Sequence, residues 1–184
     1  MATIGVTGHR VLLDRELLLK SIDHALSRLS ERFHGEPMTL MTALAEGSDR
    51  LVATQFRANG SRHIVAILPL KPEDYISDFE NDESRKEFSE LLNVADEVIQ
   101  LPDFPDRNEA YEAAGRYVVD HCDALICIWD GLPEQGRGGT GSTVERARKR
   151  GIPLVWIRAG NREPGTMTPT SLRNEEGKTE FENW

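Results

Sequence analysis

A glycine-rich turn between a buried strand and a helix is the feature that most constrains this chain. Residues 136–142 read GRGGTGS. The apolar run before them, 124–129, predicts a fully buried strand, and the segment after them, 144–150, predicts a helix that ends at Gly151. Glycine lets a phosphate approach the backbone closely, and the free N–H groups at a helix N-terminus favour negative charge. The sequence therefore predicts an anion site at this turn.

The turn does not fit the two common nucleotide-binding fingerprints. It lacks the Gly-Lys-Ser/Thr ending of a P-loop, and its glycine spacing differs from that of the dinucleotide turn. It resembles instead the Gly-Gly-x-Gly-Thr-x-x-Glu signature of the LOG family of nucleotide-processing proteins, with serine in place of the usual threonine. The matching positions are Gly138, Gly139, Gly141, Ser142 and Glu145.

Two further segments resemble the wider SLOG superfamily, which contains the LOG and DprA-like proteins. Residues 42–53, TALAEGSDRLVA, are similar to the Ser-Gly-x-Ala-x-Gly-x-Asp pattern of the DprA-like branch. Residues 4–10, IGVTGHR, resemble the first strand and turn of those proteins. The three segments follow one another in the same order as in the superfamily and span about residues 3–158. The resemblance implies a Rossmann-like domain that binds a nucleotide.

Alternating strands and helices predict the same fold class from the pattern alone. Such alternation is typical of a three-layer α/β domain, in which helices cover both faces of a mostly parallel sheet. We expect one such domain over 1–158 and a polar tail or linker over 159–184, which has few apolar residues to bury. The predicted strands are 3–7, 38–44, 63–69, 97–101, 124–129 and 152–157; the predicted helices are 14–33, 48–58, 83–95, 108–122 and 144–150; and 71–81 is predicted to be a long loop with a short helix.

The candidate ligand-binding residues all follow predicted strands. Ligands of open parallel sheets bind beyond the carboxyl ends of the strands, at the point where the strand order reverses. The three glycine-bearing turns can therefore converge on one crevice. The candidates are Thr7, Gly8, His9, Arg10, Glu46, Gly47, Ser48, Asp49, Asp130, Gly138, Gly139, Thr140, Gly141, Ser142 and Glu145.

Several of these residues have an alternative, structural interpretation. Arg10 could bind a phosphate through two parallel hydrogen bonds, or it could face solvent from a turn together with His9. Ser48 or Asp49 could cap the following helix instead of contacting a ligand. Asp130 could accept hydrogen bonds from ribose hydroxyls, or it could form a turn with the next glycine.

The resemblance to LOG proteins also implies a possible activity. In LOG-type phosphoribohydrolases the glutamate at the position of Glu145 is implicated in hydrolysing the bond between base and ribose 5'-monophosphate. Those enzymes carry an Arg-Lys pair on the preceding helix, where this chain has Ala114 and only Arg116 nearby. Because the pair is absent, we expect a domain that senses a nucleotide or NAD-derived molecule. The alternative is a nucleoside 5'-monophosphate N-glycosidase that uses Glu145 with Arg116.

Composition limits the partners and the chemistry. The formal net charge of -9 argues against non-specific binding to nucleic acid and to anionic membranes. The two cysteines, Cys122 and Cys127, have no metal-site spacing, so neither a metal nor a separate cofactor is expected. No apolar run approaches the roughly 20 residues that span a bilayer, and Met1 leads directly into the first strand. We therefore expect a cytoplasmic protein. The resemblance further implies a homo-oligomer, and the polar tail suggests an attached or partner effector.

Overall fold

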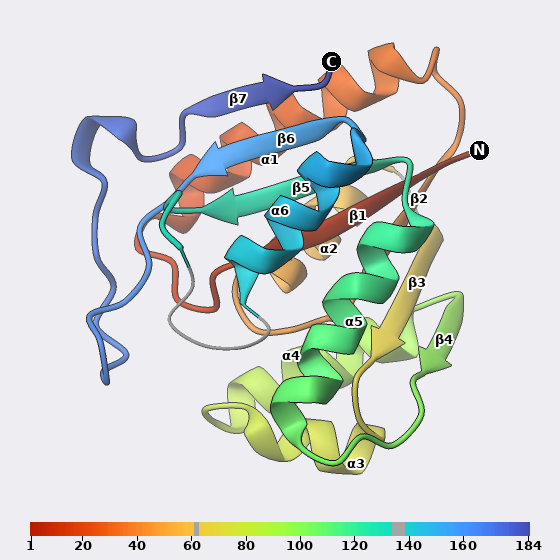
Figure 1. Ribbon diagram of the computed structural model, residues 1–184, viewed down its shortest axis with the longest axis vertical. Helices are drawn as coiled ribbons and strands as arrows, with labels where there is room; N and C mark the ends of the chain where they lie inside the picture. The colour runs from red at the N-terminus through yellow and green to blue at the C-terminus, as the bar shows by residue number, and fades with distance from the viewer. Residues whose placement is uncertain (61–62, 134–138) are drawn as a thin grey trace.

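The computed structural model describes residues 1–60, 63–133 and 139–184. Within them, seven strands form one sheet in the order β4-β3-β2-β1-β5-β6-β7, and helices lie on both faces (Figure 1). The predicted three-layer α/β, Rossmann-like fold is confirmed. The strands are β1 Ala2–Gly8, β2 Met38–Thr42, β3 His63–Leu68, β4 Glu97–Gln100, β5 Ala124–Trp129, β6 Leu154–Arg158 and β7 Thr179–Glu182. The α-helices are α1 Arg15–Arg32, α2 Ser48–Ala58, α3 Pro72–Tyr75, α4 Asp82–Asn93, α5 Arg107–His121 and α6 Thr140–Arg150, and the 3-10 helices are η1 Ile76–Asp78 and η2 Arg173–Glu175.

The order of the strands reverses between β1 and β5. Strands β1 to β4 extend the sheet in one direction, and the chain then crosses to the other side of β1 to form β5 and β6. All of these strands run parallel, so their carboxyl ends share one edge. In this register Gly8, the last residue of β1, is opposite Ile128 of β5. The switch point therefore lies beside the turn after β1.

Each face of the sheet has its own apolar core. The central strands are buried on both sides and read as continuous apolar runs, and every residue of β5 is buried. Ile126 and Ile128 contribute to the core under α1, α2 and α4. Leu125 and Cys127, which point the other way, contribute to the core under α5 and α6. Figure 1 shows α5 and α6 in front of the sheet and α1 and α2 behind it. No helix in the described ranges is long and apolar enough to cross a membrane.

The C-terminal segment differs from the predicted polar tail, because β7 adds an antiparallel strand beside β6. Arg158 pairs with Glu180 at 2.5 Å, and Arg148 of α6 pairs with Glu182 at 2.7 Å. Phe181 packs edge-on against His24 of α1, with ring centroids 5.7 Å apart. The strand therefore depends on partners distant in sequence.

Candidate functional site

The turn after β1 is bonded to both neighbouring strand ends. The His9 N–H donates to the carbonyl of Ile128 at the end of β5, at 3.0 Å. The carbonyl of His9 accepts the N–H and the hydroxyl of Ser48, the first residue of α2, at 3.1 and 2.8 Å. The N–H of Asp130 donates to Nε2 of His9 at 3.1 Å. The structure thus brings three of the predicted segments together at the switch point.

Glycine permits this close approach at two positions. Gly47 has a φ of +79°, and a Cβ there would meet the carbonyl oxygens of His9 and Arg10. A Cβ at Gly8 would meet the side chain of Ser48. Both glycines are therefore needed for the chain to pack against itself, whether or not a ligand is bound.

The surroundings of His9 favour its neutral ring. Nε2 can accept the Asp130 N–H only while it carries no proton, so this hydrogen bond favours the neutral ring. Burial lowers the His9 pKa, and the nearby Asp130 carboxylate opposes this only in part. The 3.3 Å contact between Nε2 and Oδ1 of Asp130 is therefore not an ion pair at neutral pH. Oδ1 also accepts the Leu132 N–H at 2.9 Å, so Asp130 does form the predicted turn.

The start of α2 is occupied by the chain's own polar groups. Asp49 is buried and accepts the hydroxyl of Thr42 at 2.9 Å and the N–H of Ala43 at 3.0 Å. Burial raises the pKa of Asp49 to about 6, against the effect of these hydrogen bonds. Arg50 is also buried, and its Nε donates to the carbonyl of Leu44 at 2.9 Å. Asp49 and Ser48 therefore hold the turn after β2 in place.

Arg10 is held at this edge by Glu46. Nη2 of Arg10 donates to Glu46 and to the carbonyl of Asp78, the latter at 3.1 Å. Glu46 also accepts the N–H of Glu80 at 2.8 Å and the hydroxyl of Ser84. Burial disfavours the ionised carboxylate, but these hydrogen bonds and the charge of Arg10 keep the pKa of Glu46 below its ordinary value. The Arg10 side chain is 44% exposed, whereas that of Glu46 is 11% exposed.

The N-terminus of α6 has no side-chain cap. The helix begins after Gly139, and the hydroxyls of Ser142 and Thr143 both donate back to the Gly139 carbonyl, at 3.0 and 3.3 Å. Neither hydroxyl accepts a hydrogen bond from the N–H groups of Thr140 and Gly141, which have no partner inside the helix. By contrast, side chains cap the N-termini of α1, α4 and α5 through Asp14, Asn81 and Asp106. Gly138 of the predicted turn lies outside the described residues.

The two candidate catalytic residues do not meet. The Glu145 side chain is 68% exposed and pairs with Lys149, one turn further along α6, at 3.5 Å. Arg116 on α5 pairs with Glu112 at 3.7 Å. Thr7, by contrast, lies near the end of β1 opposite Cys127, next to the switch point.

A polar cluster that the sequence pattern did not predict lies beside Arg10, whose Nη2 donates to the carbonyl of Asp78. It contains Tyr75 of α3, Asp78 of η1 and Tyr111 of α5. The Tyr111 hydroxyl and the Arg107 guanidinium both donate to Asp78, the latter at 2.7 Å. Its members come from segments that are distant in sequence, and 71–81 was expected to be mainly loop. The only sequence signal was the pair Tyr75-Ile76 among carboxylates.

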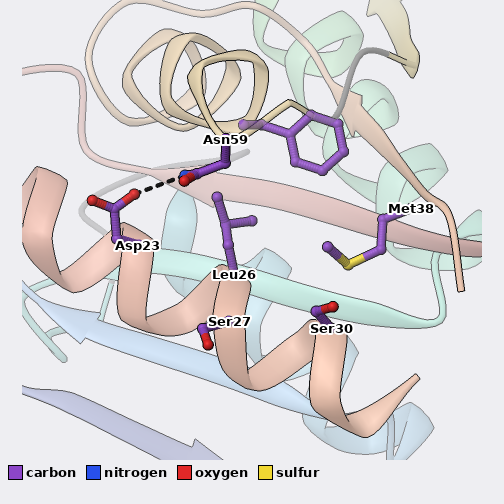
Figure 2. Close-up of a pocket in the computed structure, with 7 residues that line it drawn as sticks. Asp23, Leu26, Ser27, Ser30, Met38 and Asn59 are labelled. Carbon is purple, nitrogen blue, oxygen red and sulfur yellow. Dashed lines mark hydrogen bonds between the residues drawn. The ribbon is translucent and has the colours of Figure 1, made fainter. Parts of the chain in front are cut away.

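A half-open pocket of about 190 Å³ lies elsewhere in the molecule. It is formed by α1, α2 and the first residue of β2, Met38, so it lies at the amino edge of the sheet. Figure 2 shows Asp23 and Asn59 joined across it by a hydrogen bond of 2.7 Å. The lining residues are Asp23, Leu26, Ser27, Ser30, Met38, Phe56 and Asn59. This pocket is separate from the predicted ligand edge.

Comparisons with known proteins identify no family. No protein-family model matches the chain, and no curated protein matches it. Among solved structures, the X-ray structure of TM1055, a target of the Northeast Structural Genomics Consortium, is similar with 16% sequence identity. The similarity covers 84% of this chain and 72% of that one, with a TM-score of 0.49. Among the described residues, no group of three or more His, Cys, Asp or Glu is arranged to hold a metal ion.

Proposed function

We propose that this chain binds a nucleotide or an NAD-derived molecule through a phosphate at the N-terminus of α6. The observation that carries the proposal is the uncapped start of α6, which follows β5 beside the switch point. Free N–H groups and the helix dipole attract an anion there. The similarity of Gly138, Gly139, Gly141 and Ser142 to the LOG signature of the SLOG superfamily supports the same assignment.

The placement of the acidic residues favours binding without hydrolysis. Cleavage of a glycosidic bond needs a carboxylate directed at the sugar and an acid for the leaving group. Glu145 is exposed and paired with Lys149, and Arg116 is paired on its own helix. The second candidate, a nucleoside 5'-monophosphate N-glycosidase, is favoured by one observation only. Glu145 lies on α6, about 5 Å along the helix axis from Ser142.

A small-molecule ligand also fits the charges of α6 better than nucleic acid does. Arg146 makes two hydrogen bonds to Asp120, and Arg148 makes two to Glu182. These cations are neutralised inside the chain, so they do not form a basic surface for a phosphate backbone. We further propose that the protein is a homo-oligomer and that a fused or partner effector reads the bound state. Light scattering tests the first point, and a monomer at all concentrations would contradict it.

The proposal is tested by following binding and turnover together. The protein is incubated with nucleoside 5'-monophosphates, NAD and ADP-ribose while thermal unfolding and release of free base are measured. A ligand present at a thousand times its Kd stabilises the folded state by about 4 kcal/mol. We expect stabilisation without base release. Base release that disappears in Glu145→Gln would establish the glycosidase instead, and no stabilisation by any compound would contradict ligand binding.

A further inference from the structure

The pocket between α1 and α2 takes no part in the proposed function. Its volume is about 190 Å³, whereas an engineered cavity of about 150 Å³ in another protein is large enough to bind benzene. Figure 2 shows Leu26 and Met38 pointing into the space between the two helices, with Asp23 and Asn59 at one end and Met38 at the other. The pocket therefore has a polar end and an apolar end, and it can hold a group about as large as a benzene ring.

Hydrogen bonds fix the orientation of the groups at the polar end. Oδ1 of Asp23 accepts Nε2 of Gln55 at 2.5 Å and Nδ2 of Asn59 at 2.7 Å. Nδ2 of Asn59 also donates to the carbonyl of Gln55 at 3.1 Å, so both of its hydrogens are used. Because both partners of this nitrogen are acceptors, the amide cannot be flipped, and its oxygen Oδ1 is left for another donor.

The unmet hydrogen-bonding capacity of the pocket is mainly that of acceptors. In the part of the chain that the structure describes, no group donates to Oδ2 of Asp23 or to Oδ1 of Asn59. The hydroxyls of Ser27 and Ser30, which follow Asp23 on α1, also make no hydrogen bond to described residues. A ligand that donates several hydrogen bonds can satisfy these groups.

The charge of the lining points to a cation. Asp23 is exposed, and it is the only ionisable residue among the described residues that line the pocket. It forms no ion pair with a cation of the described ranges. A primary ammonium group carries a positive charge and three N–H donors, which match the carboxylate oxygen, the amide oxygen and one serine hydroxyl. An anion would be repelled.

The other end of the pocket suits a hydrocarbon or aromatic body. Leu26 and Phe56 are buried, and Met38 is partly buried. These three side chains supply the apolar part of the lining. The flexible, polarisable side chain of methionine adapts to groups of different shape and makes favourable contacts with aromatic rings.

We propose that this pocket binds a small organic ammonium ion. Its nitrogen lies against Asp23 and Asn59, and its apolar body lies over Leu26 toward Met38. The inference does not depend on the proposed function, because the pocket is at the amino edge of the sheet and the phosphate is placed at the carboxyl edge. An exposed ion pair contributes little, so we expect a Kd on the order of 1 mM.

Benzylammonium is the probe, and benzyl alcohol and benzoate are its uncharged and anionic counterparts. Each compound is titrated into isotope-labelled protein while NMR follows the side-chain amide of Asn59 and the backbone amides of Ser27 and Ser30. We expect saturable shifts with benzylammonium, binding about fivefold weaker with benzyl alcohol, and no binding of benzoate. Equal affinity for benzylammonium and benzyl alcohol, or no saturable shift at Asn59, would overturn the proposal.

Asp23→Asn removes the charge and keeps an oxygen that can accept from Gln55 and Asn59. In this variant benzylammonium should bind about fivefold more weakly, no better than benzyl alcohol. Glu16→Gln is the matched control, because Glu16 is exposed on the same helix and lies outside the lining. It should leave the affinity unchanged. Equal weakening in both variants would show general attraction to an acidic protein and would overturn the site.

A further variant tests the cavity itself. In Ser30→Phe the new ring would occupy the space between α1 and α2, and position 30 is only partly buried, so the helix can accept it. We expect this variant to keep its melting temperature and to lose the saturable shifts with both benzylammonium and benzyl alcohol. Unchanged binding of benzylammonium in Ser30→Phe would place the cation outside the pocket and overturn the proposal.

Discussion

Two helices of this molecule, α2 and α6, start in the same way and end up in different environments. Each begins directly after a glycine, Gly47 or Gly139, and neither has a side-chain cap. The N-terminus of α2 is closed by the chain itself, since the N–H of Ser48 donates to the carbonyl of His9. The start of α6 receives no such group from another described segment. A glycine before a helix therefore indicates close approach, but the approaching group can be the chain or a ligand.

The polar residues around the two helix starts also differ, in their burial and in their hydrogen bonds to the rest of the chain. At α2, Ser48, Asp49 and Arg50 are buried and bonded to backbone or side-chain groups of the chain. At α6, Thr140 and Ser142 are only partly buried. The residues at α2 hold the turns after β1 and β2 together, whereas the residues at α6 keep polar groups that a ligand can contact.

The largest effect is expected from Gly47→Ala, which disrupts the packing of the start of α2 against the turn after β1. The new Cβ would collide with two backbone carbonyls, which cannot move without shifting the turn after β1. We expect a loss of more than about 3 kcal/mol in the free energy of unfolding. Gly35→Ala is the control, because Gly35 also has a positive φ, +71°, but open space around it. It should cost only about 1 kcal/mol in the same urea titration. Equal losses would show that backbone strain, and not the contact with the turn, is what matters.

The fold was predictable because it depends on local periodicity. The strand 124–129 was predicted with its observed bounds, and the other five strands of the parallel set differ from their predictions by two residues or fewer at each end. Strand β7 was missed because only Phe181 in it is apolar, and because its stability comes from Arg148, Arg158 and α1. Such partners cannot be read from the strand itself.

The candidate site was predictable only in its location. The sequence places Gly8, Gly47 and Gly139 at strand carboxyl ends, and hydrogen bonds around His9 confirm that the first two turns meet the end of β5. It could not show that Asp49 is bonded to Thr42 and Ala43, or that Glu46 compensates the charge of Arg10. Those facts depend on distances between segments, as does the position of Tyr75. The roles in ligand binding stay predictions.

The second effect concerns the buried charge at α2. Asp49 has a folded pKa of about 6 against 3.8 in an unfolded chain, so the folded state binds more protons between these values. Its contribution is therefore favourable below pH 3.8 and is lost as the pH rises through about 6. The two-unit difference corresponds to about 3 kcal/mol. In Asp49→Asn this group does not titrate. The stability of the variant relative to the wild type should therefore rise by about that amount between pH 4 and pH 7.

Urea unfolding of both proteins across this pH range measures the difference directly. Glu145→Gln serves as a control, because Glu145 is exposed and its replacement should change the free energy of unfolding by less than about 0.5 kcal/mol. If the difference in stability between Asp49→Asn and the wild type is also constant with pH, burial does not raise the pKa of Asp49. The contrast between the two helix starts would then be weaker.

The third effect converts α6 into a capped helix. In Gly139→Asp the carboxylate can accept the free N–H groups of the first turn, as Asp14 does for α1. We expect the free protein to gain about 1 kcal/mol and the phosphate ligand to lose its site. Thermal unfolding with and without the best nucleotide measures both. Unchanged ligand stabilisation in Gly139→Asp would place the phosphate elsewhere.

The smallest effect compares the two serines that follow these glycines. The hydroxyl of Ser48 is buried and donates to His9, so Ser48→Ala should cost about 1 kcal/mol. The carbonyl of His9 still accepts the backbone N–H of residue 48, which limits the loss. Ser142 donates to Gly139 at a partly buried position where water can replace it, so Ser142→Ala should change stability by less than about 0.5 kcal/mol. Urea midpoints of the two variants decide the matter. If Ser142→Ala loses as much stability as Ser48→Ala, the two hydroxyls stabilise the fold equally. The polar groups at the start of α6 would then have a structural role, as those at α2 do.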